Sequence, residues 1–136
     1  MQEVELSKIV IDDEKKEQVI VLKEKEGTRI VPIVIGMNEV VAIKLKLSGF
    51  SPPRPLTHDL FCSVLKELRV NLNKVIIDNL LNGTFHAKLY LQGQESGSHI
   101  VDARPSDSIA LAVRFNTPIF IEEVVFEKLS LNIEDL

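Results

Sequence analysis

The stretch from His99 to Phe115 constrains the fold of this chain most, because a short strand pattern passes through a polar turn directly into an almost wholly apolar helix. Pro105 disfavours helical backbone in the residue before it, so the helix is predicted to begin with Ser106 as its N-cap and Asp107 in its first turn. A helix without a polar face is predicted to be buried, with packing layers on both sides. The apolar residues are Ile109, Ala110, Leu111, Ala112, Val113 and Phe115.

Composition narrows the class of protein. The 136 residues fit one domain, residues 1–136, with a core of ordinary size. The single cysteine, Cys62, forms no internal disulfide, which predicts a small buried side chain and a reducing, cytoplasmic compartment. Neither a leader-like N-terminus nor an apolar run of about 18 residues is present, so we expect no membrane association. The formal net charge of -4 argues against general electrostatic binding of nucleic acid.

Hydrophobic periodicity predicts alternating strands and helices. Pro32 cannot donate to a strand ladder, so its strand is predicted near an edge or with a bulge. Asn82-Gly83 favours a type I′ hairpin turn. Residues 43–47 alternate like a strand, but we favour a helix from Asn38. The predicted strands, besides the short one before Pro105, are 3–11, 18–25, 28–35, 72–81, 84–92 and 118–121. The predicted helices, besides the one after Pro105, are 38–47, 122–131 and an amphipathic helix that follows residues 54–59. This amphipathic helix has one apolar stripe, made of Leu60, Phe61, Val64, Leu65 and Leu68.

The two halves of the chain resemble each other. Three strands followed by a helix occur twice, and residues 27–31 align with residues 97–101 as two short Gly-to-Val segments. We therefore predict an α+β fold in which a duplicated β-β-β-α unit, residues 3–70 and 71–131, forms two antiparallel sheets packed around central helices.

Two helix entrances carry the polar residues with possible chemistry, at 54–59 and at 102–107. Each combines an arginine, a proline, a hydroxyl and an aspartate, and a helix N-terminus attracts anions while arginine matches two phosphate oxygens. Phosphodiester hydrolysis needs charge stabilisation, an activated water and a proton donor. The candidate catalytic residues are His58, Asp59 and Asp107, the candidate phosphate-binding residues are Arg54, Arg104, Thr57 and Ser106, and the candidate ligand for a divalent metal such as Mg²⁺ is Asp102.

Each of these residues also has a purely structural interpretation. Thr57 and Ser106 are ordinary caps, and Arg104 pairs with Asp102 across a strand end in that interpretation. The chain has no H-x-x-x-H, C-x-x-C or glycine-rich phosphate loop, so it gives no support to a zinc enzyme or a nucleotide-binding fold.

At these residues the chain, from about Val4 to Glu127, resembles the bifunctional nuclease family, also known as a widespread bacterial domain of uncharacterised function. The landmarks are Lys25-Glu26-Gly27, Pro32-Ile-Val-Ile35-Gly36, Arg54-Pro55-Leu56-Thr57-His58-Asp59-Leu60 and Asp102-Ala103-Arg104-Pro105-Ser106-Asp107-Ser-Ile-Ala110-Leu111-Ala112. The resemblance implies cleavage of RNA and DNA, as described for plant members, whereas bacterial members are often left without an assigned activity.

Three functions stay open at this point. The first is a nuclease acting on RNA or DNA through His58 and its Arg and Asp neighbours. The second is a non-catalytic binding or assembly module, in which the motifs hold helix ends and form a subunit interface. The third is a regulator that binds small anions at the same helix starts. A hydrophobic content of 45% also favours a homo-oligomer. The enzymatic hypothesis requires both helix entrances to open onto one pocket.

Overall fold

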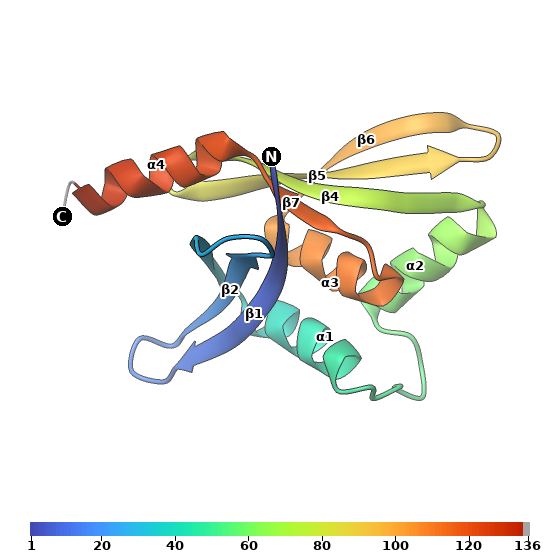
Figure 1. Cartoon of the computed structure of the whole chain (residues 1–136). Helices are drawn as coiled ribbons and strands as arrows, with labels where there is room; N and C mark the ends of the chain where they lie inside the picture. The colour runs from blue at the N-terminus through green and yellow to red at the C-terminus, as the bar shows by residue number, and fades with distance from the viewer. Residues whose placement is uncertain (135–136) are drawn as a thin grey trace.

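The computed structural model describes the backbone of residues 1–134 and the side chains of residues 1–130. This part of the chain contains both strands and helices in an α+β arrangement (Figure 1). The elements in order are β1 (Gln2–Asp12), β2 (Glu17–Glu24), β3 (Ile30–Ile35), α1 (Met37–Leu47), α2 (Thr57–Glu67), β4 (Val70–Leu81), β5 (Thr84–Gly93), β6 (Gly97–Ala103), α3 (Pro105–Phe115), β7 (Ile119–Ile121) and α4 (Glu123–Glu134).

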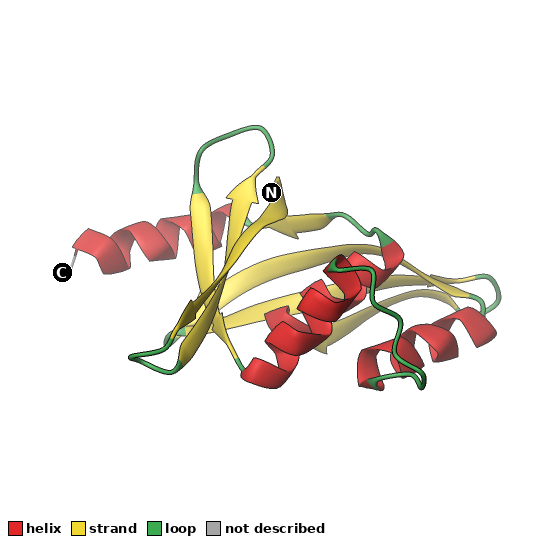
Figure 2. Cartoon of the chain, turned by 90° about the horizontal axis from the view of Figure 1, so that it is seen from below, coloured by secondary structure: helices red, strands yellow, loops and turns green. Residues whose placement is uncertain are grey.

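All of the strands belong to one seven-stranded sheet, with the order β3-β2-β1-β7-β4-β5-β6. The prediction of two separate sheets is therefore wrong. The short strand β7 pairs antiparallel with β1 and parallel with β4, so its backbone joins the two halves. The β1–β3 part is strongly turned relative to the β4–β6 part (Figure 2). Three strands followed by a helix do occur twice, but a duplication stays a prediction.

Several local predictions are confirmed. β3, which contains Pro32, lies at an edge of the sheet, where a residue without an N–H is tolerated. Asn82 and Gly83 have φ angles of 50° and 79°, as the tight turn between β4 and β5 requires. Residues 37–47 form a helix, in agreement with the choice made over a strand, and Cys62 is buried.

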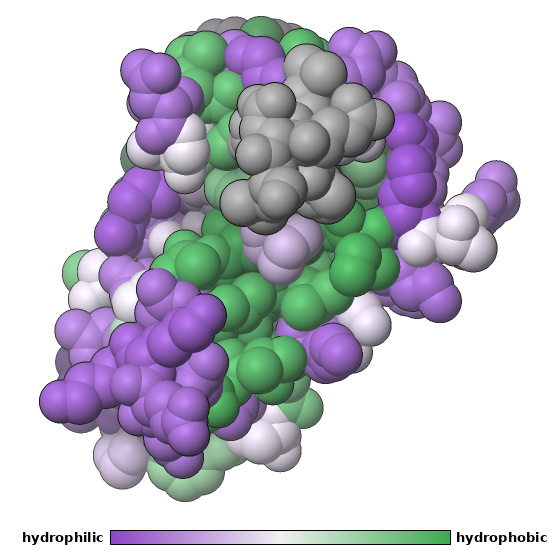
Figure 3. Space-filling model, turned by 90° about the vertical axis from the view of Figure 1, so that its left-hand side faces the viewer, coloured by the Kyte–Doolittle hydropathy of each residue, from purple (hydrophilic) through white to green (hydrophobic). Residues whose placement is uncertain are grey.

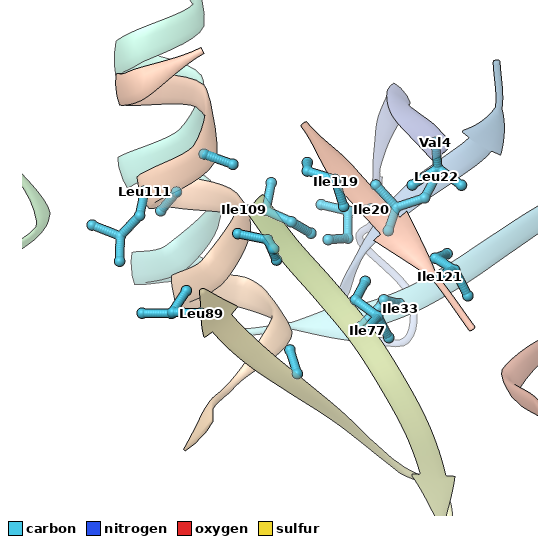
Figure 4. Packing of buried hydrophobic residues seen from close by; sticks show 14 of the residues in the cluster. Val4, Ile20, Leu22, Ile33, Ile77, Leu89, Ile109, Leu111, Ile119 and Ile121 are labelled. Atoms are coloured by element: carbon cyan, nitrogen blue, oxygen red, sulfur yellow. The ribbon is translucent and has the colours of Figure 1, made fainter. Parts of the chain in front are cut away.

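The helix α3 is the centre of the packing. It contacts α1, α2, β4 and β5, and its residues Ile109 to Ala112 are at most 3% exposed. One hydrophobic cluster includes side chains from both halves of the chain, and Figure 4 shows Ile109 of α3 near the β7 residue Ile119. The predicted burial of this helix is therefore confirmed, and α1, α2 and α3 together cover one face of the sheet (Figure 2).

The helix α4 packs on β4, and Arg29 adds a polar connection between α4 and the N-terminal half of the chain. The Arg29 guanidinium donates to Glu24 and to Glu123 at the start of α4, and it lies 3.9 Å from the centre of the Phe126 ring. The pKa of the Glu24 carboxyl is lowered mainly by these bonds from Arg29. No helix in the described part of the chain is long and apolar enough to cross a membrane.

Part of the apolar surface is not covered. On α2 and its C-cap residue, Leu60, Val64 and Leu68 are 57%, 46% and 66% exposed, whereas Cys62 and Leu65 are buried against the body of the protein. The predicted apolar stripe exists, but of its five residues only Leu65 is buried, and the other four are exposed. Figure 3 shows a second gathering of apolar residues in a hollow on the side where α4 ends.

Candidate functional site

The N-terminal ends of α2 and α3 meet in space, although they are distant in the sequence. Nε2 of His58 in the first turn of α2 lies 2.9 Å from Oδ1 of Asp107 in the first turn of α3, across 49 residues of sequence. The packing of α2 on α3 holds the two side chains together. The central condition of the enzymatic hypothesis, that both helix entrances open onto one place, is therefore met by these two residues.

Both helices begin one residue earlier than a hydroxyl cap predicts. Pro105 is the first residue of α3 and Arg104 is the N-cap with extended backbone, because proline lacks the N–H that a first helical position leaves free. Ser106 is consequently inside the helix and buried. Thr57 is likewise the first residue of α2, after the N-cap Leu56. The predicted caps at Thr57 and Ser106 are therefore wrong.

Arg104 extends the His58–Asp107 pair into a network. Its Nε donates to Oδ2 of Asp107 at 2.9 Å, and its Nη2 donates to Oε1 of Glu39 in the first turn of α1 at 3.1 Å. The Arg104 side chain is 66% exposed, and within the described residues its Nη1 donates no hydrogen bond. One edge of the guanidinium is thus open toward solvent and toward an anionic ligand.

The network keeps Asp107 ionised and sets which nitrogen of His58 faces it. Burial raises the pKa of the Asp107 carboxyl, but the hydrogen bonds from Arg104 and His58 outweigh it, so this pKa lies below its ordinary value. An ionised carboxylate only accepts, so Nε2 of His58 carries the proton in the bond to Asp107. In a neutral imidazole, Nδ1 is then the basic nitrogen, and it makes no hydrogen bond within the described residues.

Two hollows flank this network and share one wall, made by Thr57, His58, Arg104 and Asp107. One hollow, the α1–α2 pocket, has a volume of about 460 Å³ and also includes Glu39. The His58–Asp107 pair is therefore accessible from two sides, which distinguishes it from an ion pair sealed in a core.

The other hollow, the α2–β6 pocket, has a volume of about 410 Å³. Its additional lining is mostly apolar: Phe61 of α2, Leu89 of β5, Val101 of β6 and Leu111 of α3. Asp102 lies at its rim, is 75% exposed and forms an ion pair with Lys88 at 3.2 Å in place of the expected one with Arg104.

The remaining candidates lie elsewhere. Asp59 points to Arg114, whose Nε donates to it at 2.8 Å and lowers the pKa of that carboxyl, and its other oxygen accepts from the backbone N–H of Leu56. Ser106 lines a separate hollow with β3 residues such as Pro32. Arg54 is exposed in the loop before α2 and lines neither pocket.

Sequence reasoning missed two charged residues of this region, Glu39 and Arg114. Glu39 follows a helix start in the same way as Asp59 and Asp107, and this signal was present in the sequence. Arg114 lies in the last turn of α3, and no local pattern connects it with Asp59. Among the described residues, no three His, Cys, Asp or Glu side chains are grouped closely enough to hold a metal ion.

Comparisons with known proteins show the family of this chain. A family model described as the bifunctional nuclease domain matches residues 20–134. A Mycobacterium tuberculosis protein named as uncharacterised is 41% identical over 135 residues, which are 99% of this chain and 80% of the relative.

More distant relatives carry a functional name. Bifunctional nuclease 1 of Oryza sativa subsp. japonica is 26% identical over 110 residues, and bifunctional nuclease 2 of Arabidopsis thaliana is 27% identical over 107 residues. The matched parts are 79% and 76% of this chain but 33% and 32% of those proteins. On the family match and the mycobacterial similarity, the chain belongs to the bifunctional nuclease domain family.

Proposed function

We propose that this protein is a nuclease that hydrolyses phosphodiester bonds in RNA, DNA or both. The observation that carries the proposal is the 2.9 Å contact between His58 and Asp107, beside the open guanidinium of Arg104 and next to two pockets. The names of the plant relatives support the same reaction class.

The reaction assigns one role to each of three side chains. Nδ1 of His58 takes a proton from water as the water oxygen forms a bond to phosphorus and the bond from phosphorus to the leaving oxygen breaks. Asp107 stabilises the resulting imidazolium through Nε2, as a carboxylate orients histidine in hydrolases. Nη1 of Arg104 donates to a phosphate oxygen on which charge develops. The leaving oxygen takes a proton from bulk water, and the imidazolium returns its proton to solvent.

The test is cleavage of labelled RNA and single-stranded DNA by the purified full-length chain. We expect His58→Ala to reduce kcat on the order of 10²-fold or more, because general acid–base catalysis contributes about that much. His99→Ala is the matched control, since His99 is exposed on β6 and lines neither pocket. Equal cleavage by His58→Ala and His99→Ala preparations would remove the proposed role and indicate a contaminating nuclease.

A divalent ion such as Mg²⁺ is a further part of the proposal. The carboxylate of Asp102 at the rim of the α2–β6 pocket would supply an oxygen ligand, with water filling the other positions. Addition of EDTA to the cleavage assay separates a metal-dependent reaction from one that the His58–Asp107 pair performs alone. We also expect the protein to act in the reducing cytoplasm, since its only cysteine is buried and unpaired.

A non-catalytic binding or assembly module is the second candidate function. It is favoured by the mutual pairing of Arg104, Asp107 and Glu39, which ties α1 to α3, and by the uncovered apolar stripe of α2. In that case Arg104→Ala lowers the melting temperature, and no cleavage is detected with either protein. A homo-oligomer formed through α2 belongs to this candidate and is compatible with the first.

A further inference from the structure

We infer that the α2–β6 pocket holds an unpaired nucleobase and that the protein therefore acts on single-stranded nucleic acid. The inference rests on the proposed nuclease function and names the substrate class of the same site. The base occupies the apolar part of the pocket while its phosphate lies at the polar wall formed by His58 and Arg104.

The lining of the pocket combines a buried apolar floor with a partly exposed aromatic wall. Leu89 and Leu111 form a nearly buried floor, each 3% exposed, whereas the ring of Phe61 is 40% exposed on the wall. Phe61 follows His58 by three residues on α2, so the two side chains lie on the same side of the helix, one turn apart. Arg104 lines the same pocket, and a partly exposed aromatic ring combined with a basic side chain is the arrangement on which bases stack in proteins that bind single strands.

The size of the pocket also suits a single base. The pocket volume of about 410 Å³ lies within the range of roughly 300–1,000 Å³ that is typical of small-molecule sites. Such a pocket admits a base that has been turned out of a strand. It cannot receive a base pair that remains stacked inside a duplex, because the face of that base is covered by its neighbours.

The charges around the pocket limit how strongly phosphate groups bind there. Asp107 and Glu39 already offset the positive charge of Arg104, and the whole chain has a formal net charge of -4. Phosphate attraction therefore contributes little affinity, and most of the binding free energy has to come from the base. A duplex offers mainly its phosphates to this site, so it is expected to bind weakly.

The test measures binding by fluorescence anisotropy, with a labelled single-stranded oligonucleotide and a labelled hairpin duplex, in EDTA and with the full-length chain. We expect the single strand to bind at least about tenfold more tightly than the duplex. We expect Phe61→Leu to weaken single-strand binding about tenfold, since base–aromatic stacking contributes about that factor, and Phe61→Tyr to retain it. Phe50→Leu is the matched control, because Phe50 is an exposed aromatic residue of the α1–α2 loop outside the pocket.

Salt dependence provides an independent readout. One phosphate contact, at Arg104, corresponds to a slope of about -0.7 in log affinity against log salt concentration for a single strand. A slope several times steeper would mean that a basic surface elsewhere holds the nucleic acid, and it would overturn the inference.

The outcomes separate this inference from the proposed function. If cleavage depends on His58 but Phe61→Leu binds and cleaves as the wild type does, the proposed nuclease function is supported and the inferred base binding is wrong. If Phe61→Leu loses single-strand binding but the wild type cleaves nothing, the inferred base binding is supported and the proposed catalysis is wrong. If Phe61→Leu changes the oligomeric state of the protein in solution but leaves its binding of nucleic acid unchanged, Phe61 contacts a second copy of the chain and the inference is overturned.

Discussion

The carboxylate of Asp107 serves two neighbours at once, and this arrangement makes Asp107→Asn informative. Arg104 donates to both carboxylate oxygens, so the single oxygen of an asparagine would stay on Arg104 and its NH₂ group would face Nε2 of His58. Nε2 would then have to accept, and the proton would move to Nδ1. We expect kcat to fall on the order of 10²-fold with little change in KM, because Nδ1 is no longer basic.

The pH dependence of the melting temperature of Asp107→Asn provides a second readout, which reports on the charge of this carboxylate. The pKa of Asp107 is depressed in the folded protein, so its contribution to stability is present above the unfolded pKa of about 3.9 and is lost as the pH falls through the folded value. The difference in Tm between wild type and Asp107→Asn should therefore shrink as the pH falls below the pKa of an ordinary aspartate side chain. A difference that is constant with pH would show that the carboxylate charge does not stabilise the fold.

At the residue scale, the helix-start motifs located part of the site. His58, Arg104 and Asp107 were predictable because a helix N-terminus restricts which residues occupy it. The different partners of Asp59 and Asp107 were not predictable, although the two motifs look alike. Asp59 pairs with Arg114 and Asp107 with His58 because α2 and α3 pack with these sides together, and such packing is set by contacts distant in sequence.

The helices are held in place by a buried arginine. Arg114 of α3 is 6% exposed, and it donates to Asp59 of α2, to the carbonyl of Ala42 in α1 and to the carbonyl of Ala110 in its own helix. It therefore connects all three helices on this face of the sheet. Its bond to Asp59 adds to the packing of α2 against α3, which places His58 next to Asp107.

We expect Arg114→Met to lower the free energy of unfolding by about 3 kcal/mol, because Asp59 and two carbonyls lose a buried partner while the apolar volume is retained. The Tm should fall by roughly 10 °C. Arg54→Met is the control variant: Arg54 is exposed, so we expect this variant to melt close to the wild-type temperature. If both variants melt alike, the three-way connection contributes nothing to stability.

At the element scale, most strands and helices followed from local pattern, and their assembly did not. The hairpin at Asn82-Gly83 and the edge position of Pro32 each have a local cause in backbone geometry. The three residues of β7 were predicted as a strand, but their position between β1 and β4 depends on pairing across the whole chain. That pairing made one sheet out of the two that the apparent repeat had suggested.

Within the residues whose side chains the structure describes, a continuous apolar arc along α2 stays exposed. Leu60, Val64 and Leu68 fall within one side of the helix, next to the side that Cys62 and Leu65 bury. Soluble monomers rarely expose a large contiguous apolar patch, and a helix face of this kind is suited to an isologous contact in which two copies bury the same surface. The Leu68 side chain lies outside the α2–β6 pocket, so this contact and the binding of nucleic acid can be tested separately.

We expect the wild type to form a homo-oligomer in solution and Leu68→Glu to shift it toward the monomer, because a charge within an apolar interface has to lose its water without gaining a partner. Light scattering coupled to size exclusion measures the mass of the oligomer directly.

Leu47→Glu is the matched control variant. Leu47 is 57% exposed at the end of α1, compared with 66% for Leu68, so this substitution introduces the same charge at a similarly exposed helix end. A monomeric wild type, or equal dissociation by both variants, would contradict an interface on α2. Dissociation by Leu68→Glu with unchanged cleavage would mean that each copy carries a complete site, whereas loss of both would make the α2 contact a condition for activity.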